Sequence, residues 1–415
     1  MHCLLIHQVF VGPDEAGGTR HYDLARMIAE SGHDFTVVTS TVSYLTGEPR
    51  ARTPFLGPAS RPEAVRVLSG WTPRTLHRSF AWRVVAFLVF MVTSIQKGLF
   101  AHRVDLVMGT SPPIFQAVSA WIVAALRRRP FLLEIRDLWP DFAIDMGVLR
   151  NPILIRVSKW LERFLYCRAD HFIVNSPAYR EYLLGKGIPD LMISVVPNGV
   201  DDAVFDPAAR GGAFRAELGL DERDFLVTYA GALGMANDIP TILRAATRLR
   251  GLAPDIRILV VGDGKERTSI EEAVAREGLT NVSVLGAVPK KKVPEVLAAS
   301  DACLATLMDI PMFRTTYPNK VFDYMAAGRP VVLAIDGVIR EVVETAQAGV
   351  FVQPGDDQAL ASVLSTLATN RLAASRMGVQ GRLYVVEHFD RRKQSVAFAE
   401  VLLKVASGRV GRATD

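Results

Sequence analysis

Short apolar runs rich in Val and Ile alternate with helical patterns along this chain, and the alternation occurs in two series. Buried strands separated by helices are typical of parallel sheets. The first series has strand-like runs at 34–39, 105–109, 131–135, 171–174 and 192–196, with helical patterns at 19–31, 112–128, 152–168 and 177–186. The second has strand-like runs at 225–230, 256–261, 282–286, 302–306, 331–335 and 349–352. We therefore predict an α/β protein with two Rossmann-like, doubly wound domains.

The two series meet near residues 197–201, in the run Pro197-Asn198-Gly199-Val200-Asp201. A chain of 415 residues is also longer than one hydrophobic core usually organises. We predict a first domain over 1–197 and a second over 198–390, with a last helix at about 391–407 packing back on the first. Because ligands of open α/β sheets bind beyond the carboxyl ends of the strands, domains facing across a cleft would place the chemistry there.

Composition and cysteine spacing restrict the class of protein further. Hydrophobic residues make up 49% and charged residues 22% of the chain, which is typical of a globular protein. Cys3, Cys167 and Cys303 are too far apart for a disulfide framework or a cysteine zinc site. Residues 1–7 read as a first strand and not as an export signal, so we expect a cytoplasmic protein.

Basic residues are concentrated between positions 50 and 103, where Glu63 is the one acidic residue found. The cations are Arg50, Arg52, Arg61, Arg66, Arg74, Arg78, Arg83, Lys97 and Arg103. Such a segment favours an anionic neighbour. No nucleic-acid motif or set of stacking aromatic residues accompanies the charge, so nucleic acid is not expected. An anionic membrane surface is the favoured partner, on the inner face of the cell membrane.

The same segment contains an uninterrupted apolar run at 84–92. About 20 apolar residues are needed to span a bilayer, so we interpret this run as too short to cross. Two alternatives remain: a buried core helix, or a helix lying in the cytoplasmic leaflet with basic flanks.

The run at 317–330 carries the clearest candidate site. Lys320 and Asp323 lie three residues apart just after Pro318, so a helix beginning there would place both on one face of its first turns. The positive end of the helix and Lys320 suit a phosphate, and Asp323 can accept hydrogen bonds from ribose hydroxyls. The alternative is an amphipathic helix with Val321 and Phe322 turned inward.

Three glycine-containing turns follow strand-like runs and could hold an anion at a helix start. They contain Gly17 and Gly18; Gly231 and Gly234; and Gly262, followed by Lys265 and Arg267. An ordinary strand-to-helix turn is the simpler explanation of a glycine pair. None of the three is the G-x-G-x-x-G fingerprint of dinucleotide enzymes.

Taken together, these motifs resemble glycosyltransferase family 4, whose members have the two-domain GT-B fold. The resemblance covers nearly the whole chain. The run Asp137-Leu138-Trp139-Pro140 and the run 318–328 are most similar to the branch of O-antigen fucosamine-type transferases. The motifs are Gly17-Gly18, residues 134–141, Ala169-Asp170, Val174-Asn175-Ser176, residues 196–201, residues 261–264 and residues 318–328.

The resemblance implies a retaining transfer from a UDP-sugar, of an N-acetylated hexose or a deoxyhexose, without metal or other cofactor. The acceptor would be a polyprenyl diphosphate-linked or other glycan in cell-surface polysaccharide synthesis, and the departing diphosphate would take its proton. The implied catalytic residues are Lys320, Asp137 and Asp141. The implied donor-binding residues are Gly17, Gly18, Gly231, Gly234, Gly262, Lys265, Arg267, Asn319, Lys320 and Asp323.

Several of these assignments have a structural alternative. Asp137 could cap the turn before Trp139. His7 and His21, near the first glycine turn, are weaker candidates for touching substrate, because a lone histidine is usually structural.

The chain departs from the family pattern at two places. Thr315 stands where the wider family has the first glutamate of its E-x7-E motif, and Ala232 and Asn237 replace an Arg and a Lys. Lys320, Lys265 and Arg267 are then the cations available to a diphosphate. These departures keep two rivals open: a UDP-sugar 2-epimerase of the same fold, and a non-catalytic homologue that binds a sugar nucleotide.

Overall fold

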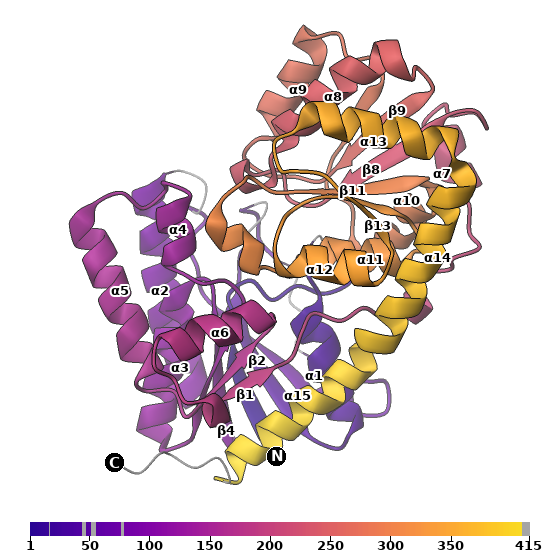
Figure 1. Ribbon diagram of the computed structural model, residues 1–415. Helices are drawn as coiled ribbons and strands as arrows, with labels where there is room; N and C mark the ends of the chain where they lie inside the picture. The colour runs from indigo at the N-terminus through magenta and orange to yellow at the C-terminus, as the bar shows by residue number, and fades with distance from the viewer. Residues whose placement is uncertain (16, 44–46, 51–54, 76–78, 409–415) are drawn as a thin grey trace. The chain divides into compact units, whose positions relative to one another are not determined.

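The computed structural model describes residues 1–15, 17–43, 47–50, 55–75, 79–408. The chain forms two compact units (Figure 1). The first unit comprises Met1–Gly12, Thr19–Pro197 and Arg392–Asp415, and the second comprises Pro13–Gly18 and Asn198–Arg391. Of the basic residues between 50 and 103, Arg52 and Arg78 lie outside the described residues.

The first unit is built on a seven-stranded sheet in the order β3-β2-β1-β4-β5-β6-β7, and every neighbouring pair is parallel. Because β1 pairs with both β2 and β4, the strand order reverses there, and ligands of such sheets bind beside that point. The strands are β1 (His2–Ile6), β2 (Asp34–Ser40), β3 (Val65–Gly70), β4 (Leu106–Ser111), β5 (Phe131–Ile135), β6 (His171–Val174) and β7 (Ile193–Val195). The helices are α1 (Arg20–Glu30), α2 (Phe80–Leu99), α3 (Ile114–Arg127), α4 (Asp141–Asp145), α5 (Pro152–Tyr166), α6 (Pro177–Gly185) and α15 (Arg391–Ala406).

The second unit has six parallel strands in the order β10-β9-β8-β11-β12-β13, which reverses between β8 and β11. The strands are β8 (Phe225–Ala230), β9 (Ile256–Val261), β10 (Val282–Leu285), β11 (Ala302–Thr306), β12 (Val331–Ala334) and β13 (Gly349–Phe351). The helices are α7 (Gly212–Glu217), α8 (Ile239–Leu252), α9 (Arg267–Arg276), α10 (Val293–Ala299), α11 (Asn319–Ala326), α12 (Val338–Thr345), α13 (Asp357–Thr369) and α14 (Arg371–His388).

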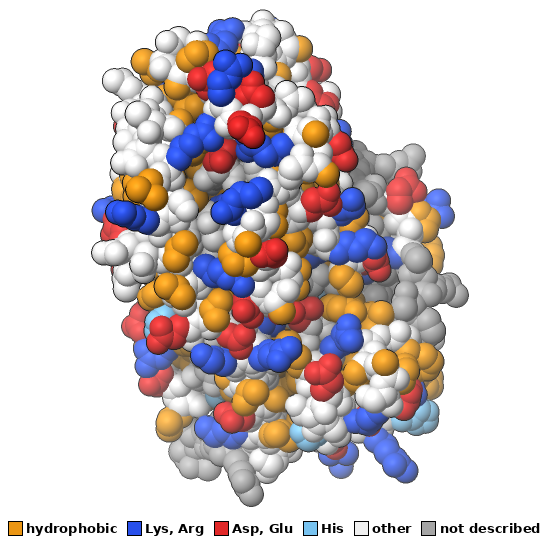
Figure 2. Space-filling view, turned by 90° about the vertical axis from the view of Figure 1, so that its right-hand side faces the viewer, with side chains coloured by type: hydrophobic (Ala, Val, Ile, Leu, Met, Phe, Trp, Pro, Cys, Tyr) orange, Lys and Arg blue, Asp and Glu red, His pale blue; other side chains and the backbone are white. Residues whose placement is uncertain are grey.

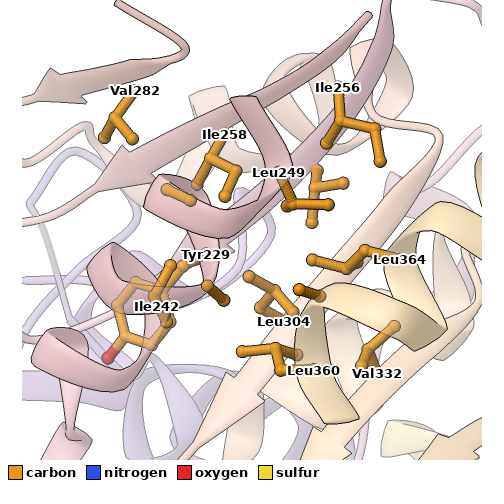
Figure 3. Close-up of a cluster of buried hydrophobic side chains, with 14 of the residues drawn as sticks. Tyr229, Ile242, Leu249, Ile256, Ile258, Val282, Leu304, Val332, Leu360 and Leu364 are labelled. Carbon is orange, nitrogen blue, oxygen red and sulfur yellow. The ribbon is translucent and has the colours of Figure 1, made fainter. Parts of the chain in front are cut away.

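The core of the second unit explains why its strands read as apolar runs. Figure 3 shows side chains of α8 and α13, among them Ile242 and Leu364, gathered with side chains of the strands. Ile258, Leu304 and Val332 come from three different strands and are at most 1% exposed. A sheet covered by helices buries consecutive residues of each strand, which gives an unbroken apolar run in the sequence.

The two predicted parallel sheets are confirmed, and most element bounds agree within two residues. The sequence analysis missed β3, the edge strand of the first sheet. Within the sheet it pairs with β2, and exposed Arg66 interrupts its apolar residues, so no continuous apolar run marks it.

The assignment of residues 13–18 to the first domain was wrong. This segment follows β1 in the sequence, but its backbone contacts the second unit: Glu15 and Pro13 carbonyls each accept a hydrogen bond of 3.2 Å, from the Lys290 and Lys291 amides. The first glycine turn is therefore attached to the second sheet. At the other end of the chain, Phe398 of α15 is fully buried in the core of the first unit.

The apolar run at 84–92 lies within α2, which continues through residues outside the uninterrupted run and has 20 residues. Among the described residues, the stretch Ala81–Leu99 is the one helix long and apolar enough to cross a membrane by length and composition. One face of α2 packs on the rest of the unit, with Ala86 and Phe90 buried. Val92, by contrast, is 63% exposed.

Candidate functional site

Helix α11 holds the central residue of the site, Lys320, at the carboxyl edge of the second sheet. The helix starts directly after Pro318, whose extended backbone ends the preceding segment. Tyr324, one turn further along, fixes the helix to β8: its hydroxyl accepts a hydrogen bond from the Ala230 amide at 2.8 Å. Lys320 is thereby directed at the end of β8.

The Lys320 ammonium is held by neutral groups. Its Nζ donates to the Tyr229 hydroxyl and to Oδ1 of Asn237, each at 2.8 Å, and lies 4.2 Å from the centroid of the Tyr229 ring. The Tyr229 hydroxyl in turn donates to the Ala232 carbonyl at 2.8 Å. Within the described part of the chain, no carboxylate forms a salt bridge with Lys320.

This environment changes the charge state of the lysine. Burial lowers the pKa of the Lys320 ammonium to about 7, since no nearby carboxylate compensates for the lost hydration. At neutral pH the amine is thus divided between its charged and neutral forms. An anion placed beside it would favour the charged form, so the site is suited to a phosphate.

Glycines let the turns after β8 and β9 lie against each other beside this lysine. A Cβ on Gly231 would lie 3.2 Å from Nζ of Lys320. A Cβ on Gly262, whose φ is +155°, would lie 1.8 Å from the Gly231 carbonyl oxygen, which no side chain permits. The amides of Gly231 and Leu233 bond to the carbonyls of Val261 and Asp263 at 2.9 Å. The predicted glycines thus bring backbone close to Lys320, whereas Gly234 borders open space.

Asp323 has a partner that the sequence analysis missed. Nζ of Lys290 lies 2.5 Å from Oδ2 of Asp323, and both side chains are mostly buried. The signal was available in the run Lys290-Lys291-Lys292, which follows β10 on the same sheet edge. The first glycine turn reaches this area as well, because a Cβ on Gly18 would lie 3.4 Å from Nδ2 of Asn319.

The other two predicted cations differ from Lys320. Arg267 is bound by two carboxylates, with Nε 2.8 Å from Glu271 and Nη1 3.4 Å from Asp263. Its charge is therefore largely matched within the protein. Lys265 is exposed on the same turn. Among the described residues, neither Lys265 nor Arg267 forms a hydrogen bond with Lys320.

Thr315 ends the 3₁₀ helix Pro311–Thr315, and its hydroxyl donates to the Met312 carbonyl at 2.6 Å. It therefore serves a local turn at the position where the family carries a glutamate. Asn237, at the second departure, has a clear role as an acceptor for Lys320.

The first unit has its own polar centre at the ends of its strands. Glu134 on β5 is fully buried, and its two oxygens meet Nε of Arg20 at 3.1 Å and Nε2 of His21 at 2.5 Å. Burial alone would raise the pKa of Glu134, but His21 and Arg20 hold it well below its usual range. Arg20 also donates to the Pro197 carbonyl at 2.7 Å. Glu134 thus fixes α1 to the sheet.

Around this centre, five buried polar atoms have no hydrogen-bond partner among the described residues. All five stand at or just beyond the carboxyl ends of β1, β4, β5 and β6, beside the point where the strand order reverses. Buried polar atoms are normally satisfied, so such a cluster indicates water or a ligand. The atoms are Nδ1 of His7, Nε2 of Gln8, Oγ1 of Thr110, Nε of Arg136 and Oδ1 of Asn175.

Burial lowers the pKa of both histidines of this cluster. Burial lowers the pKa of His7 well below its ordinary value, and the adjacent His21 and Arg136 lower it further. The His7 and His21 rings lie 4.6 Å apart, edge to face. The sequence analysis ranked both as weak candidates because a lone histidine is usually structural.

Asp137 and Asp141, both predicted to act in catalysis, have different surroundings. Burial raises the pKa of Asp137 to about 6, although Arg136 opposes the shift, and the carboxylate is ionised at neutral pH. Asp141 instead opens α4, with Oδ2 2.6 Å from the Tyr182 hydroxyl and Oδ1 3.5 Å from Lys159. These contacts tie α4 to α5 and α6, so the geometry favours a structural role for Asp141.

Among the residues described, no group of three or more His, Cys, Asp or Glu side chains is arranged to hold a metal ion.

Two family models match this chain. Residues 16–199 match a model described as glycosyl transferase 4-like domain, and residues 224–370 match one described as glycosyl transferases group 1. The matches follow the two sheets. The matches leave out His7, Gln8 and the short segment before Gly17. Every other site residue named above lies within one of them.

Curated relatives share about a quarter to a third of the aligned residues. A D-inositol 3-phosphate glycosyltransferase from Nocardioides sp. is 30% identical over 55% of this chain and 53% of its own length. A glycogen synthase of Mycobacterium tuberculosis is 26% identical over 61% of this chain and 57% of its own. The chain thus matches a little over half the length of these relatives.

Solved structures match over almost the whole chain. Anabaena Alr3699/HepE, solved with UDP and glucose, has a TM-score of 0.72 at 20% identity and covers 97% of this chain and 99% of its own. WaaG, a glycosyltransferase involved in lipopolysaccharide biosynthesis, has a TM-score of 0.69 at 16% identity and covers 96% and 99%. At these identities the likeness establishes the fold, which is GT-B.

The lowered pKa of Lys320 predicts a pH dependence of stability. An unfolded lysine keeps its proton up to about pH 10.4. Between pH 7 and that value the unfolded chain therefore binds more protons than the folded one, and stability rises with pH by up to about 1.4 kcal/mol per unit from this group. We therefore expect the free energy of unfolding, measured by urea titration, to rise between pH 7 and pH 9 in the wild type relative to Lys320→Met. Parallel pH profiles would show that the pKa is not lowered.

Proposed function

Because the chain belongs to the glycosyltransferases that combine a glycosyl transferase 4-like domain with a group 1 domain, we propose that it moves a sugar from a UDP-sugar to a glycan acceptor. The observation that carries the proposal is the ammonium of Lys320, enclosed at a sheet edge where no described carboxylate pairs with it. That is the arrangement expected where a diphosphate must be held and its departing charge stabilised.

The second unit would bind the donor. Lys320 faces the diphosphate, and the glycine turns at Gly231 and Gly262 allow phosphate oxygens to approach the backbone. Asp323 would accept from the ribose hydroxyls. Its Oδ2 is already bound by Lys290, which orients the carboxylate and adds a second cation beside the nucleotide. Asn319 and Gly18 lie next to this pair. Lys265 remains a candidate for an outer phosphate contact, whereas Arg267 would first have to leave its two carboxylates.

The first unit would bind the acceptor at the unsatisfied polar atoms around His7 and Arg136. In the retaining reaction that the family implies, the bond from the sugar to the diphosphate oxygen breaks, and a bond to the acceptor hydroxyl forms on the same face. The hydroxyl proton passes to a phosphate oxygen. Asp137, whose pKa is raised by burial to about 6, would orient that hydroxyl while the phosphate oxygen takes the proton.

Protein cations take the place of a metal ion in this proposal. Lys320 and the backbone of the glycine turns would stabilise the UDP leaving group, and each charge-assisted hydrogen bond contributes about 1.5–3 kcal/mol. The sugar is proposed to be an N-acetylated hexose or deoxyhexose. Thr315, in place of a carboxylate, would then contact it through a hydroxyl or not at all.

The proposed acceptor is polyprenyl diphosphate-linked, as in the synthesis of cell-surface polysaccharides. Support comes from the Asp-Leu-Trp-Pro run at 137–140, which is similar to the O-antigen fucosamine-type branch. The curated relatives described above carry other acceptor names, so the branch assignment rests on that run and on the surface of the first unit.

That surface carries exposed apolar side chains on two helices. On α2, Val85, Leu88 and Val92 are 40–63% exposed. On α5, Ile153, Val157 and Trp160 recur at helical spacing and are 53–67% exposed, with Arg156 and Arg163 beside them. Both helices neighbour α3. Apolar stripes flanked by cations suit a peripheral helix at an anionic membrane surface, and this would bring the enzyme to a lipid-linked acceptor on the inner face.

The activity is tested by measuring UDP release with a panel of UDP-sugars and a polyprenyl diphosphate-linked glycan. We expect release that depends on the acceptor. Lys320→Met should lower kcat by about 100- to 1,000-fold, because it removes one donor to the leaving group. The matched control is Lys292→Met, an exposed lysine that pairs with Glu295, and it should keep wild-type turnover.

Other outcomes would contradict the proposal. Isomerisation of the free UDP-sugar without acceptor would instead identify a 2-epimerase. UDP binding without turnover under any acceptor would identify a non-catalytic homologue.

Membrane association is tested by sedimentation with vesicles that contain phosphatidylglycerol. We expect the protein to pellet at low salt and to be released at high salt, because each cation near the surface contributes on the order of 1 kcal/mol. The double variant Val92→Glu, Trp160→Glu should remain in the supernatant. Leu252→Glu, at an exposed leucine of the second unit, should behave as the wild type. Equal recovery with and without vesicles would remove the membrane proposal.

A further inference from the structure

Four arginines line a cavity in the second unit that the donor site does not use. The cavity has a volume of about 470 Å³ and is bordered by Arg210, Arg329, Arg371 and Arg382. Phe225, Asp301 and Pro330, at the amino ends of β8, β11 and β12, also line it. Lys320 and the glycine turns follow the carboxyl ends of the strands, so this cavity lies at the opposite edge of the same sheet.

The arginines are bound mainly by backbone carbonyls, which do not neutralise their charge. Buried Arg329 donates to the carbonyls of Leu297 at 3.0 Å and Ala298 at 2.8 Å. Arg210 donates to the Pro207 carbonyl at 3.1 Å. Arg371 lies over the Phe225 ring and donates to carbonyls of 222–223. These hydrogen bonds hold the guanidinium groups in place and leave their positive charge available.

The cavity carries an excess of positive charge. Two carboxylates line it, and the first, Asp301, is already bound by Arg215 at 3.0 Å. The second, Asp202, lies 3.9 Å from Arg382. Burial and the adjacent Arg210 and Arg215 lower the pKa of Arg329, as expected where cations crowd together. An anion entering the cavity would relieve this repulsion.

The remaining wall is apolar and comes from α14. Val379, Leu383 and Val386 lie on the cavity side of this helix. Figure 2 shows the face of the molecule on which α14 lies, with Lys and Arg side chains spread among hydrophobic ones. The volume lies within the range of small-molecule sites, and an apolar wall with a few convergent charged groups is their usual composition.

We propose that this cavity binds a small organic phosphate, with its phosphate group on the arginines and its apolar part against α14. Guanidinium groups bind phosphate through two parallel hydrogen bonds, which favours phosphate over a simple halide or an uncharged molecule. This inference does not depend on the proposed transferase activity.

The cavity is linked to the donor edge by helix α11. Arg382 donates to the carbonyl of Ala326, the last residue of α11, while Lys320 lies in the first turn of that helix. Eight helical residues span roughly 12 Å. A phosphate bound at the cavity would therefore be an effector that acts at a distance from the donor, and not a second substrate in contact with it.

Isothermal titration with phenyl phosphate tests the site, since this probe has one phosphate and one apolar ring. We expect saturable binding to the wild type that becomes at least tenfold weaker in Arg210→Gln and in Val379→Glu, which places a negative charge on the wall. Arg376→Gln, an exposed arginine of α14 outside the cavity, should bind as the wild type.

A further variant tests whether phenyl phosphate binds at the donor site and not in the cavity. Lys320→Met should retain the binding, because Lys320 does not line the cavity. The proposal is overturned if the wild type shows no saturable binding, if both cavity variants bind with wild-type affinity, or if Lys320→Met abolishes the binding.

Discussion

The proposed donor site depends on Lys320, which is enclosed without a carboxylate partner among the described residues. Its partners there are the hydroxyl of Tyr229, the amide oxygen of Asn237 and the Tyr229 ring, and burial lowers its pKa to about 7. A folded protein gains nothing from placing an ammonium group there, because the lost hydration is not replaced by a carboxylate. The cost is explained if the charge is completed by a ligand. The proposed ligand is a diphosphate, and the glycine turns beside Lys320 carry no side chain that would keep its oxygens away from the backbone.

The environment of Lys320 explains why this chain has Asn237 where the wider family has a lysine. A lysine at position 237 would stand beside Lys320 and repel it, whereas the amide oxygen of Asn237 accepts a hydrogen bond from it. Lys290, salt-bridged to Asp323, returns a second cation to the same sheet edge from a different strand. The site therefore keeps two lysines near the proposed donor, although the sequence positions differ from those of the wider family.

The fold was predictable because helix-covered parallel strands bury every residue, which gives apolar runs that end where the strands end. β3 was missed because an edge strand carries Arg66 on its exposed face.

Within the candidate site, the placement of Lys320 and Asp323 on one helix was predictable from their spacing. The lysine run at 290–292 was visible in the sequence, but its pairing with Asp323 and the grouping of polar atoms around His7 were not, since these residues come together only through strand order. The assignment of residues 13–18 failed for the same reason: the segment follows β1 but bonds to Lys290 and Lys291.

The most direct measurement is the number of protons taken up when UDP binds at pH 8. Calorimetry in two buffers with different ionisation enthalpies gives this number. If the diphosphate completes the charge of Lys320, the wild type takes up close to one proton, since its amine is mostly neutral at that pH, and Lys320→Met takes up none. UDP binding with no proton uptake by the wild type would contradict the account.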